Sequence, residues 1–301
     1  MQGRYQAMKK KFLKNITFDI TAVTFLVIFS IFCIVPFYLV VVASFTSEST
    51  IVREGFSFYI RDFSMSGYDI MLKNPTAILK SYGTTAFVTI FGTIASIYLA
   101  ISTGYVLSRK DFPWRNGLSF FFFFTTLFNG GLVPWYLWCS NYLGFSNSIR
   151  ALILPMIFSV WNMIIAKNFI RGIPYEIIES VKIDGAGDFT IFIKMIIPLS
   201  TPLIATLGLF TALAYWNDWY NAMLYINNKD LYTLQYYLQD ILNSADALKR
   251  VASKAGRSVK ALPMESMKMA MTVIATGPIL LLYPFLQKYF VKGLTIGALK
   301  G

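Results

Sequence analysis

The chain has 301 residues, of which 56% are hydrophobic and 14% are charged, whereas about 25% of residues are charged in an average soluble domain. This balance, with a mean hydropathy of +0.56, excludes soluble globular, disordered and collagen-like proteins and predicts a membrane protein. The net charge is +12 and histidine is absent, which excludes Ser-His-Asp and Cys-His catalytic systems and histidine-based metal sites, so we expect neither a catalytic residue nor a metal site.

Six segments are apolar and free of Asp, Glu, Lys and Arg, and about 20 such residues are needed to cross a bilayer. They lie at 20–47, 81–108, 116–149, 151–166, 195–217 and 269–287. The third is too long for one crossing, and we expect it to break at Asn129-Gly130-Gly131, with a crossing before the break and an interfacial stretch, 132–142, after it. The predicted fold is an all-α membrane protein with six transmembrane helices.

The basic tail, residues 1–18, precedes an apolar run that is longer than the core of a secretory signal, about 7–15 residues. We therefore expect an uncleaved first span in the cytoplasmic (inner) membrane, with both termini in the cytoplasm. The short connection with Arg109, Lys110 and Arg115 supports this orientation, because short basic loops stay inside. The spans carry no ionisable residue in their cores, which argues against an ion-coupled carrier or channel, the alternative from another class.

The segment 173–202, between the fourth and fifth spans, is predicted to form two short helices with a glycine break. Pro174 suits the first helical position, Gly185 and Gly187 end the first helix, and Asp188 is expected to cap the second. The apolar faces expected from helical spacing consist of Ile177, Ile178 and Val181 in the first helix and Phe189, Phe192, Ile193 and Ile196 in the second.

This segment resembles the EAA loop of ATP-binding-cassette (ABC) importer permeases, whose pattern runs roughly E-A-A-x-x-D-G-A, then an aromatic residue and I-x-L-P. The matching residues are Glu179, Asp184, Gly185, Ala186, Phe192, Ile196 and Pro198, while Ser180 and Val181 replace the two alanines. Other segments are similar to the maltose-type sugar permeases, and these are 105–109, 131–136, 143–147, 216–217, 284–285 and 292–301. The likeness covers about residues 15–301.

The resemblance implies a type I ABC importer transmembrane domain over 19–301, which imports an oligosaccharide. The implied partners are a second homologous permease subunit, two ATPase subunits and an extracytoplasmic sugar-binding protein. The chain has no Gly-Lys dipeptide and hence no Walker A loop, so we expect no enzyme activity and no cofactor in this chain, with ATP and Mg²⁺ bound by the ATPase subunits. Another cargo, such as glycerol phosphate, is an alternative, whereas a membrane-bound enzyme would need a catalytic set that the sequence lacks.

ATPase coupling is assigned by the resemblance to Glu179, Asp184, Gly185 and Ala186. A glutamate such as Glu179 can accept a charge-assisted hydrogen bond from a basic group of the ATPase. Asp184 has two interpretations, because it can contact the partner or cap the turn locally.

Two weaker candidate sites follow on the predicted outer side. Trp216, Asn217, Trp219 and Tyr220 crowd the end of the fifth span, where aromatic faces and amides suit a sugar ring, although an interfacial aromatic belt explains them equally simply. The outer loop, about 218–268, is predicted to contain an amphipathic helix from the spacing of Leu231, Leu234, Tyr237, Leu238, Ile241 and Leu242.

Arg250, Lys254 and Arg257 in this outer loop share one helical face by their spacing. In the resembled family the loop reaches toward the binding protein, so these residues are candidate binding-protein contacts, the alternative being a solvated face near headgroups. A basic outer loop also permits an acidic glycan, such as a uronate-containing oligosaccharide.

Overall fold

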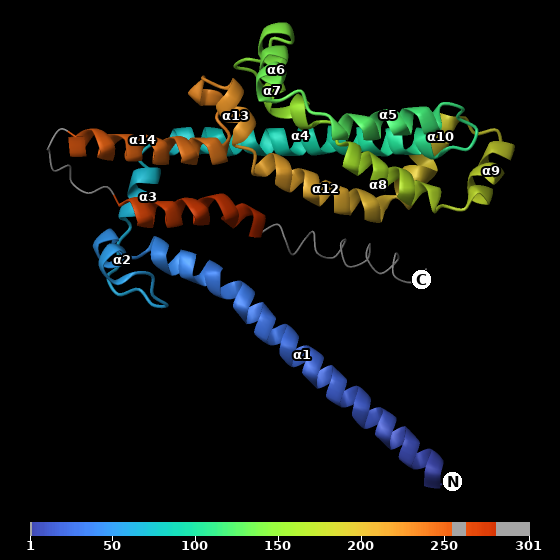
Figure 1. The fold of residues 1–301 in the computed structure, drawn as a ribbon, viewed down its shortest axis with the longest axis horizontal. Helices are drawn as coiled ribbons and strands as arrows, with labels where there is room; N and C mark the ends of the chain where they lie inside the picture. The colour runs from blue at the N-terminus through green and yellow to red at the C-terminus, as the bar shows by residue number, and fades with distance from the viewer. Residues whose placement is uncertain (1, 255–262, 281–301) are drawn as a thin grey trace. The chain divides into compact units, whose positions relative to one another are not determined.

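The structure is a computed structural model that describes residues 2–254 and 263–280. The described residues are mostly helical, as predicted, with an isolated antiparallel bridge between Thr46 and Phe63. They belong to two compact units, one formed by 1–73 with 245–274 and the other by 74–244 with 275–301. Figure 1 shows the helices in chain order.

The first unit holds three labelled helices and the start of a fourth. They are α1 (Gln2–Ser44), α2 (Glu48–Glu54), α3 (Ser66–Met71) and the helix 264–280. The carboxylate of Glu48 accepts hydrogen bonds from the backbone N–H groups of Glu265 (2.9 Å) and Ser266 (3.0 Å). A negative charge thus meets the positive end of helix 264–280, which stabilises its first turn.

The second unit holds the remaining helices, and α14 continues from it into the first unit. They are α4 (Pro75–Ser108), α5 (Arg115–Leu127), α6 (Leu132–Leu137), η1 (Trp138–Tyr142), α7 (Ile149–Ile153), η2 (Leu154–Met156), α8 (Val160–Arg171), α9 (Tyr175–Ile183), α10 (Asp188–Ile191), η3 (Phe192–Ile196), α11 (Ile197–Leu199), α12 (Thr201–Trp216), α13 (Tyr220–Tyr225), η4 (Lys229–Leu231) and α14 (Leu234–Lys254). The predicted amphipathic helix of the outer loop is present as α14, where Leu234 and Leu238 are buried.

Helix α4 is the central element of the second unit, and α8 and α12 pack along it (Figure 1). The contact with α8 is close at Gly104, because a Cβ atom there would lie 2.8 Å from the backbone nitrogen of Lys167. Between α8 and α12, the side-chain amide of Asn162 donates a hydrogen bond to Thr211 Oγ1 (3.2 Å). The three helices therefore pack together, and the candidate functional site described below adjoins them.

Two described helical segments are long and apolar enough to cross a membrane, Phe18–Ser44 in α1 and Pro75–Ser108. Three further pairs of helices qualify if each bent pair is counted as one span, with bends of 114°, 49° and 77°. The described residues therefore give two to five candidate spans. Of the predicted sixth span, 269–287, the part after residue 280 lies outside them.

The third predicted span breaks where the sequence indicates. Helix α5 ends at Leu127, and α6 with η1 leaves the Gly130-Gly131 region at 114°. The fourth predicted span, 151–166, is not one continuous helix, since α7 and η2 are separated from α8 by a 49° bend, and these helices count as one candidate span only as a bent pair. Pro155 lies before the bend and lacks the N–H group that a continuous helix would use there. After the bend, Ser159 Oγ caps the start of α8 by accepting a hydrogen bond from the N–H of Asn162 (3.3 Å).

Two further apolar runs differ from the helices that contain them. The apolar run 195–217 does not form one helix, because the chain turns by 77° between Leu199 and Thr201, and α12 starts only after that turn. The prolines at 198 and 202 favour this break. At the N-terminus, the predicted basic tail and first span lie on one continuous helix, since α1 begins at Gln2.

Candidate functional site

The candidate coupling loop, α9 to α11, begins with a helix that ends as predicted. Gly185 has φ +82°, and its N–H donates to the carbonyl of Lys182 (3.0 Å). The N–H of Ala186 donates to the carbonyl of Val181 (3.1 Å). This pair of bonds is the Schellman motif, which requires a left-handed residue and so favours glycine. Pro174 lies at the N-cap and α9 begins at Tyr175, so the helix starts one residue later than predicted.

The second helix of the loop departs from the predicted face. Phe192 and Ile196 are buried as expected, but Phe189 is 71% exposed and Ile193 40% exposed, while Ile191 is buried instead. Ile193 lies in η3, a π-helical turn, in which each turn holds more residues and the side chains rotate out of α-helical register; Phe189 and Ile191 lie before this turn, on α10. The predicted face of four is therefore wrong at two positions.

Asp188 does not cap the second helix, contrary to the prediction. Gly187 is the N-cap and makes no side-chain bond, and Asp188 is the first helical residue. Its carboxylate instead pairs with Arg109 Nη1 at 2.5 Å. The interaction joins the loop to the residue that directly follows α4.

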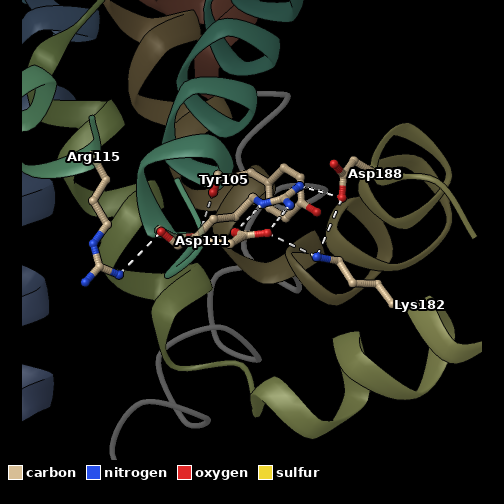
Figure 2. Close-up of polar contacts among 7 residues, drawn as sticks. Tyr105, Asp111, Arg115, Lys182 and Asp188 are labelled. Atoms are coloured by element: carbon tan, nitrogen blue, oxygen red, sulfur yellow. Dashed lines mark hydrogen bonds and ion pairs between the residues drawn. The ribbon is translucent and has the colours of Figure 1, made fainter. Parts of the chain in front are cut away.

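Arg109 is the centre of a network of four charged side chains, the clamp, and Figure 2 labels the other three, Asp111, Lys182 and Asp188. Its Nε donates to Asp111 Oδ1 (2.9 Å), and a second guanidinium nitrogen contacts the other oxygen of the same carboxylate. Lys182 of α9 lies 3.2 Å from Asp111 Oδ2 and 4.0 Å from Asp188 Oδ1. Two acids and two bases from three segments of the chain thus neutralise one another.

Arg109 and Asp111 each favour the charged form of the other. The hydrogen bond from Arg109, with a smaller contribution from Lys182, holds the pKa of Asp111 well below its usual range. The Asp111 carboxylate in turn raises the pKa of Arg109 above its ordinary value. Because these shifts move both pKa values away from neutral pH, the pair of Arg109 and Asp111 stays ionised near pH 7.

Aromatic packing extends the same clamp into the core. The guanidinium of Arg109 lies over the ring of Tyr105, 5.8 Å from its centroid, and Tyr105 stacks on Phe192 at 5.6 Å. Tyr105 and Phe192 belong to a buried cluster with Ile196 and Leu203. The base of the loop is therefore fixed to the end of α4 by both ionic and apolar contacts.

Most of the predicted coupling residues lie at the surface of the described structure. Glu179, Asp184 and Gly185 are exposed, and Ala186 is half-buried against the core cluster. The carboxylates of Glu179 and Asp184 make no hydrogen bond or ion pair with the described residues. Both carboxylates are thus open to a partner.

The four residues of the predicted sugar site separate into two groups. Trp216 is half-buried, and its Nε1 donates to the carbonyl of Ala275 (3.1 Å). Asn217, Trp219 and Tyr220 are exposed, but the Asn217 amide already donates to Leu213 O (2.9 Å) and accepts from Gln235 (3.2 Å). Tyr220 lines a cavity of about 580 Å³ beside the 129–131 break.

Asp218, between these residues, was not among the predicted site residues. Its two carboxylate oxygens accept from the backbone N–H (3.2 Å) and the side-chain amide (2.8 Å) of Asn221, which fixes the turn into α13. Burial raises its pKa, and these hydrogen bonds oppose the rise. The sequence does contain a signal for this turn, because Asp218 is an acid three residues before the amide Asn221 at the start of a helix.

Of the predicted binding-protein contacts, Arg250 is exposed on α14. Lys254 is the last residue of α14, and Arg257 lies outside the described residues. The segments 284–285 and 292–301, on which the family resemblance also rested, lie outside them as well.

No protein-family model matches the chain. It is 40% identical over 289 residues to the polygalacturonan/rhamnogalacturonan transport system permease protein YtcP of Bacillus subtilis (strain 168), which covers 96% of this chain and 100% of that protein. It is 37% identical over 284 residues to protein LplC of the same organism, covering 94% and 95% of the two chains.

Among solved structures, the fold is similar to the crystal structure of a bacterial ABC transporter involved in the import of the acidic polysaccharide alginate. The TM-score is 0.75 at 26% identity, over 91% of this chain and 96% of that chain. Together with identity of 40% over nearly the whole length of a named permease, this similarity shows that the chain belongs to the family of permease subunits of sugar ABC transport systems.

Proposed function

We propose that the chain is one of two homologous permease subunits that line the pathway of an oligosaccharide importer. It crosses the cytoplasmic membrane six times with both termini inside. The chain itself binds neither nucleotide nor metal, and two separate ATPase subunits bind ATP with Mg²⁺. An extracytoplasmic binding protein delivers the sugar.

The observation that carries this proposal is the division of the coupling loop into a fixed base and an open tip. The base is clamped to α4 through Arg109, whereas the tip exposes Glu179, Asp184 and an apolar side chain, Ile183, which is 81% exposed. Exposed apolar side chains beside unpaired carboxylates are what a protein partner would cover. Movement of an ATPase bound there would be transmitted to α4.

The proposed cargo is an acidic oligosaccharide. One relative is named for polygalacturonan, a polymer of galacturonate, and the similar solved transporter is described as an importer of acidic alginate. The net charge of +12 and the exposed Lys249 and Arg250 on α14 suit an acidic cargo. Trp216, Asn217, Trp219 and Tyr220 remain the proposed sugar contacts, and the basic residues of α14 the proposed binding-protein contact.

Uptake into proteoliposomes that contain the complete complex and its binding protein tests the proposal. Galacturonate oligosaccharides should enter only with internal ATP, and uncharged maltose oligosaccharides should enter at least tenfold more slowly. A complex whose ATPase subunit lacks its Walker A lysine is the control. Uptake that continues in this control and collapses with an uncoupler would refute an ATP-driven importer, and equal uptake of both sugars would refute only the acidic cargo.

A further inference from the structure

A cavity of about 420 Å³ lies between the end of α4, the connection to α5 and the start of the coupling loop. Its charged lining is strongly basic. The lining includes five bases and two acids, which are Arg109, Lys110, Arg115, Arg171, Lys182, Asp111 and Glu176. A cavity lined in this way is suited to an anion.

The bases of the cavity differ in whether an acid already neutralises them. Arg109 and Lys182 are paired with carboxylates in the clamp described above. Arg115 donates to the carbonyl of Arg109 at 3.4 Å, and Lys110 lies 5.6 Å from the centroid of the Tyr175 ring. These two contacts supply no negative charge.

Arg171 makes no ion pair with the described residues, so three cations of the lining lack an acid partner there. Lys167, one turn earlier on α8, donates to the hydroxyl of Ser119 (2.7 Å) and adds a further unneutralised charge nearby. Glu176, which is exposed, is the one lining acid outside the clamp. The cavity is therefore positive even after its internal ion pairs are formed.

The surface beside the cavity indicates its depth in the membrane. Trp114 is 71% exposed directly before α5, and Phe120, Phe121 and Phe124 of that helix are also exposed. An apolar exposed helix belongs in hydrocarbon, and tryptophan marks the boundary with water. The cavity adjoins Arg115, the first residue of α5, which places it at headgroup depth, where lipid phosphates lie.

We propose that this cavity binds the phosphate of an anionic phospholipid, held by Arg115, Arg171 and Lys110. The lipid would sit against the start of α9, so that it braces the coupling loop from the membrane side. This inference rests on the proposed orientation of the chain and is independent of the proposed cargo.

Native mass spectrometry of the purified complete complex in detergent tests this inference, with phosphatidylglycerol and phosphatidylcholine as the probes and without sugar or ATP. Wild type should retain phosphatidylglycerol in preference to phosphatidylcholine. The preference should fall about fivefold in Arg115→Gln and in Arg171→Gln, and about 25-fold in the double variant. Arg150→Gln/Lys229→Gln, which removes two exposed bases away from the cavity, is the matched control and should leave the preference unchanged.

Other results would overturn the inference. An equal preference in the double variant and in wild type would remove the cavity as a lipid site, and thermal stabilisation of the delipidated complex by 10 mM inorganic phosphate to the same extent as by phosphatidylglycerol would point to a soluble anion. Loss of the ATPase subunits from the double variant with unchanged lipid retention would assign the cavity to subunit docking. Arg115→Lys/Arg171→Lys, which keeps both charges, guards against misfolding and should retain most of the preference.

Discussion

Replacing Arg109 by glutamine should detach the coupling loop from α4. The side chain of Arg109 is only 20% exposed, whereas its partners Asp111 and Asp188 are 45% and 57% exposed. An exposed ion pair contributes about 0.2–1 kcal/mol, and breaking a fully buried pair costs about 3–5 kcal/mol. This network lies between those limits, so we expect the loss of two carboxylate partners to cost about 2 kcal/mol, which increases loop opening about 30-fold.

Amide hydrogen exchange of the loop in the complete complex measures this opening. Protection of the amides of α9 and α10 should fall about 30-fold in Arg109→Gln, but only about threefold in Lys182→Gln, because the contacts of Lys182 are longer and more exposed. Lys194→Gln removes an exposed charge from the same loop and is the control. Unchanged protection in Arg109→Gln, or a larger effect in Lys182→Gln, would refute the clamp.

Three further predictions follow from single positions. The pKa of Asp111 is lowered from 3.8 in the folded protein, so its stabilisation of the loop is complete above pH 3.8 and is lost only as the pH falls through the lower folded pKa. Amide exchange of the loop, corrected for its intrinsic pH dependence, should therefore show no loss of protection between pH 7 and pH 5. A loss in this range would contradict the lowered pKa. Gly104→Ala should destabilise the complex by about 1–3 kcal/mol in thermal unfolding, because its Cβ would meet the backbone of α8. Gly83→Ala on the same helix is the control, because the added Cβ has open space there. Equal effects of the two variants would argue against the close approach of α4 and α8 at Gly104. Gly185→Val should abolish sugar uptake in a subunit that still inserts into the membrane, since valine disfavours φ +82°. The control variant Gly187→Val, at φ −69°, should still take up sugar. Normal uptake by both variants would exclude the Schellman turn from coupling.

Features set by local chemistry were predictable from the sequence. The 129–131 break follows from two glycines in an overlong apolar run, and the end of α9 follows from Gly185, which alone in that turn adopts a positive φ. The amphipathic helix α14 was visible in the spacing of its leucines. In each case the signal lies within a few residues of the feature.

Features set by tertiary contacts were not predictable in the same way. The π-helical turn η3 changes which side chains are buried, and local spacing contains no sign of it. The pairing of Arg109 with Asp188 joins residues far apart in the chain, although both were expected on the same side of the membrane. Pro155 was a local signal that the apolar run concealed, and a 49° bend follows it within the predicted fourth span.

The contacts of the loop differ between its base and its tip, because the base is held by ion pairs and apolar packing, whereas the tip exposes Ile183 beside two unpaired carboxylates. In the proposed importer, a loop that transmits force must keep its contacts with α4 while its partner binds and leaves. The side chain of Arg109 suits this role, because it holds one carboxylate from its own segment and one from α10. The tip has the opposite need, because side chains such as Ile183 must leave water only when a partner is present. Since α4 packs on α8 with no space for a Cβ at Gly104, a pull on the clamp should move these two helices together.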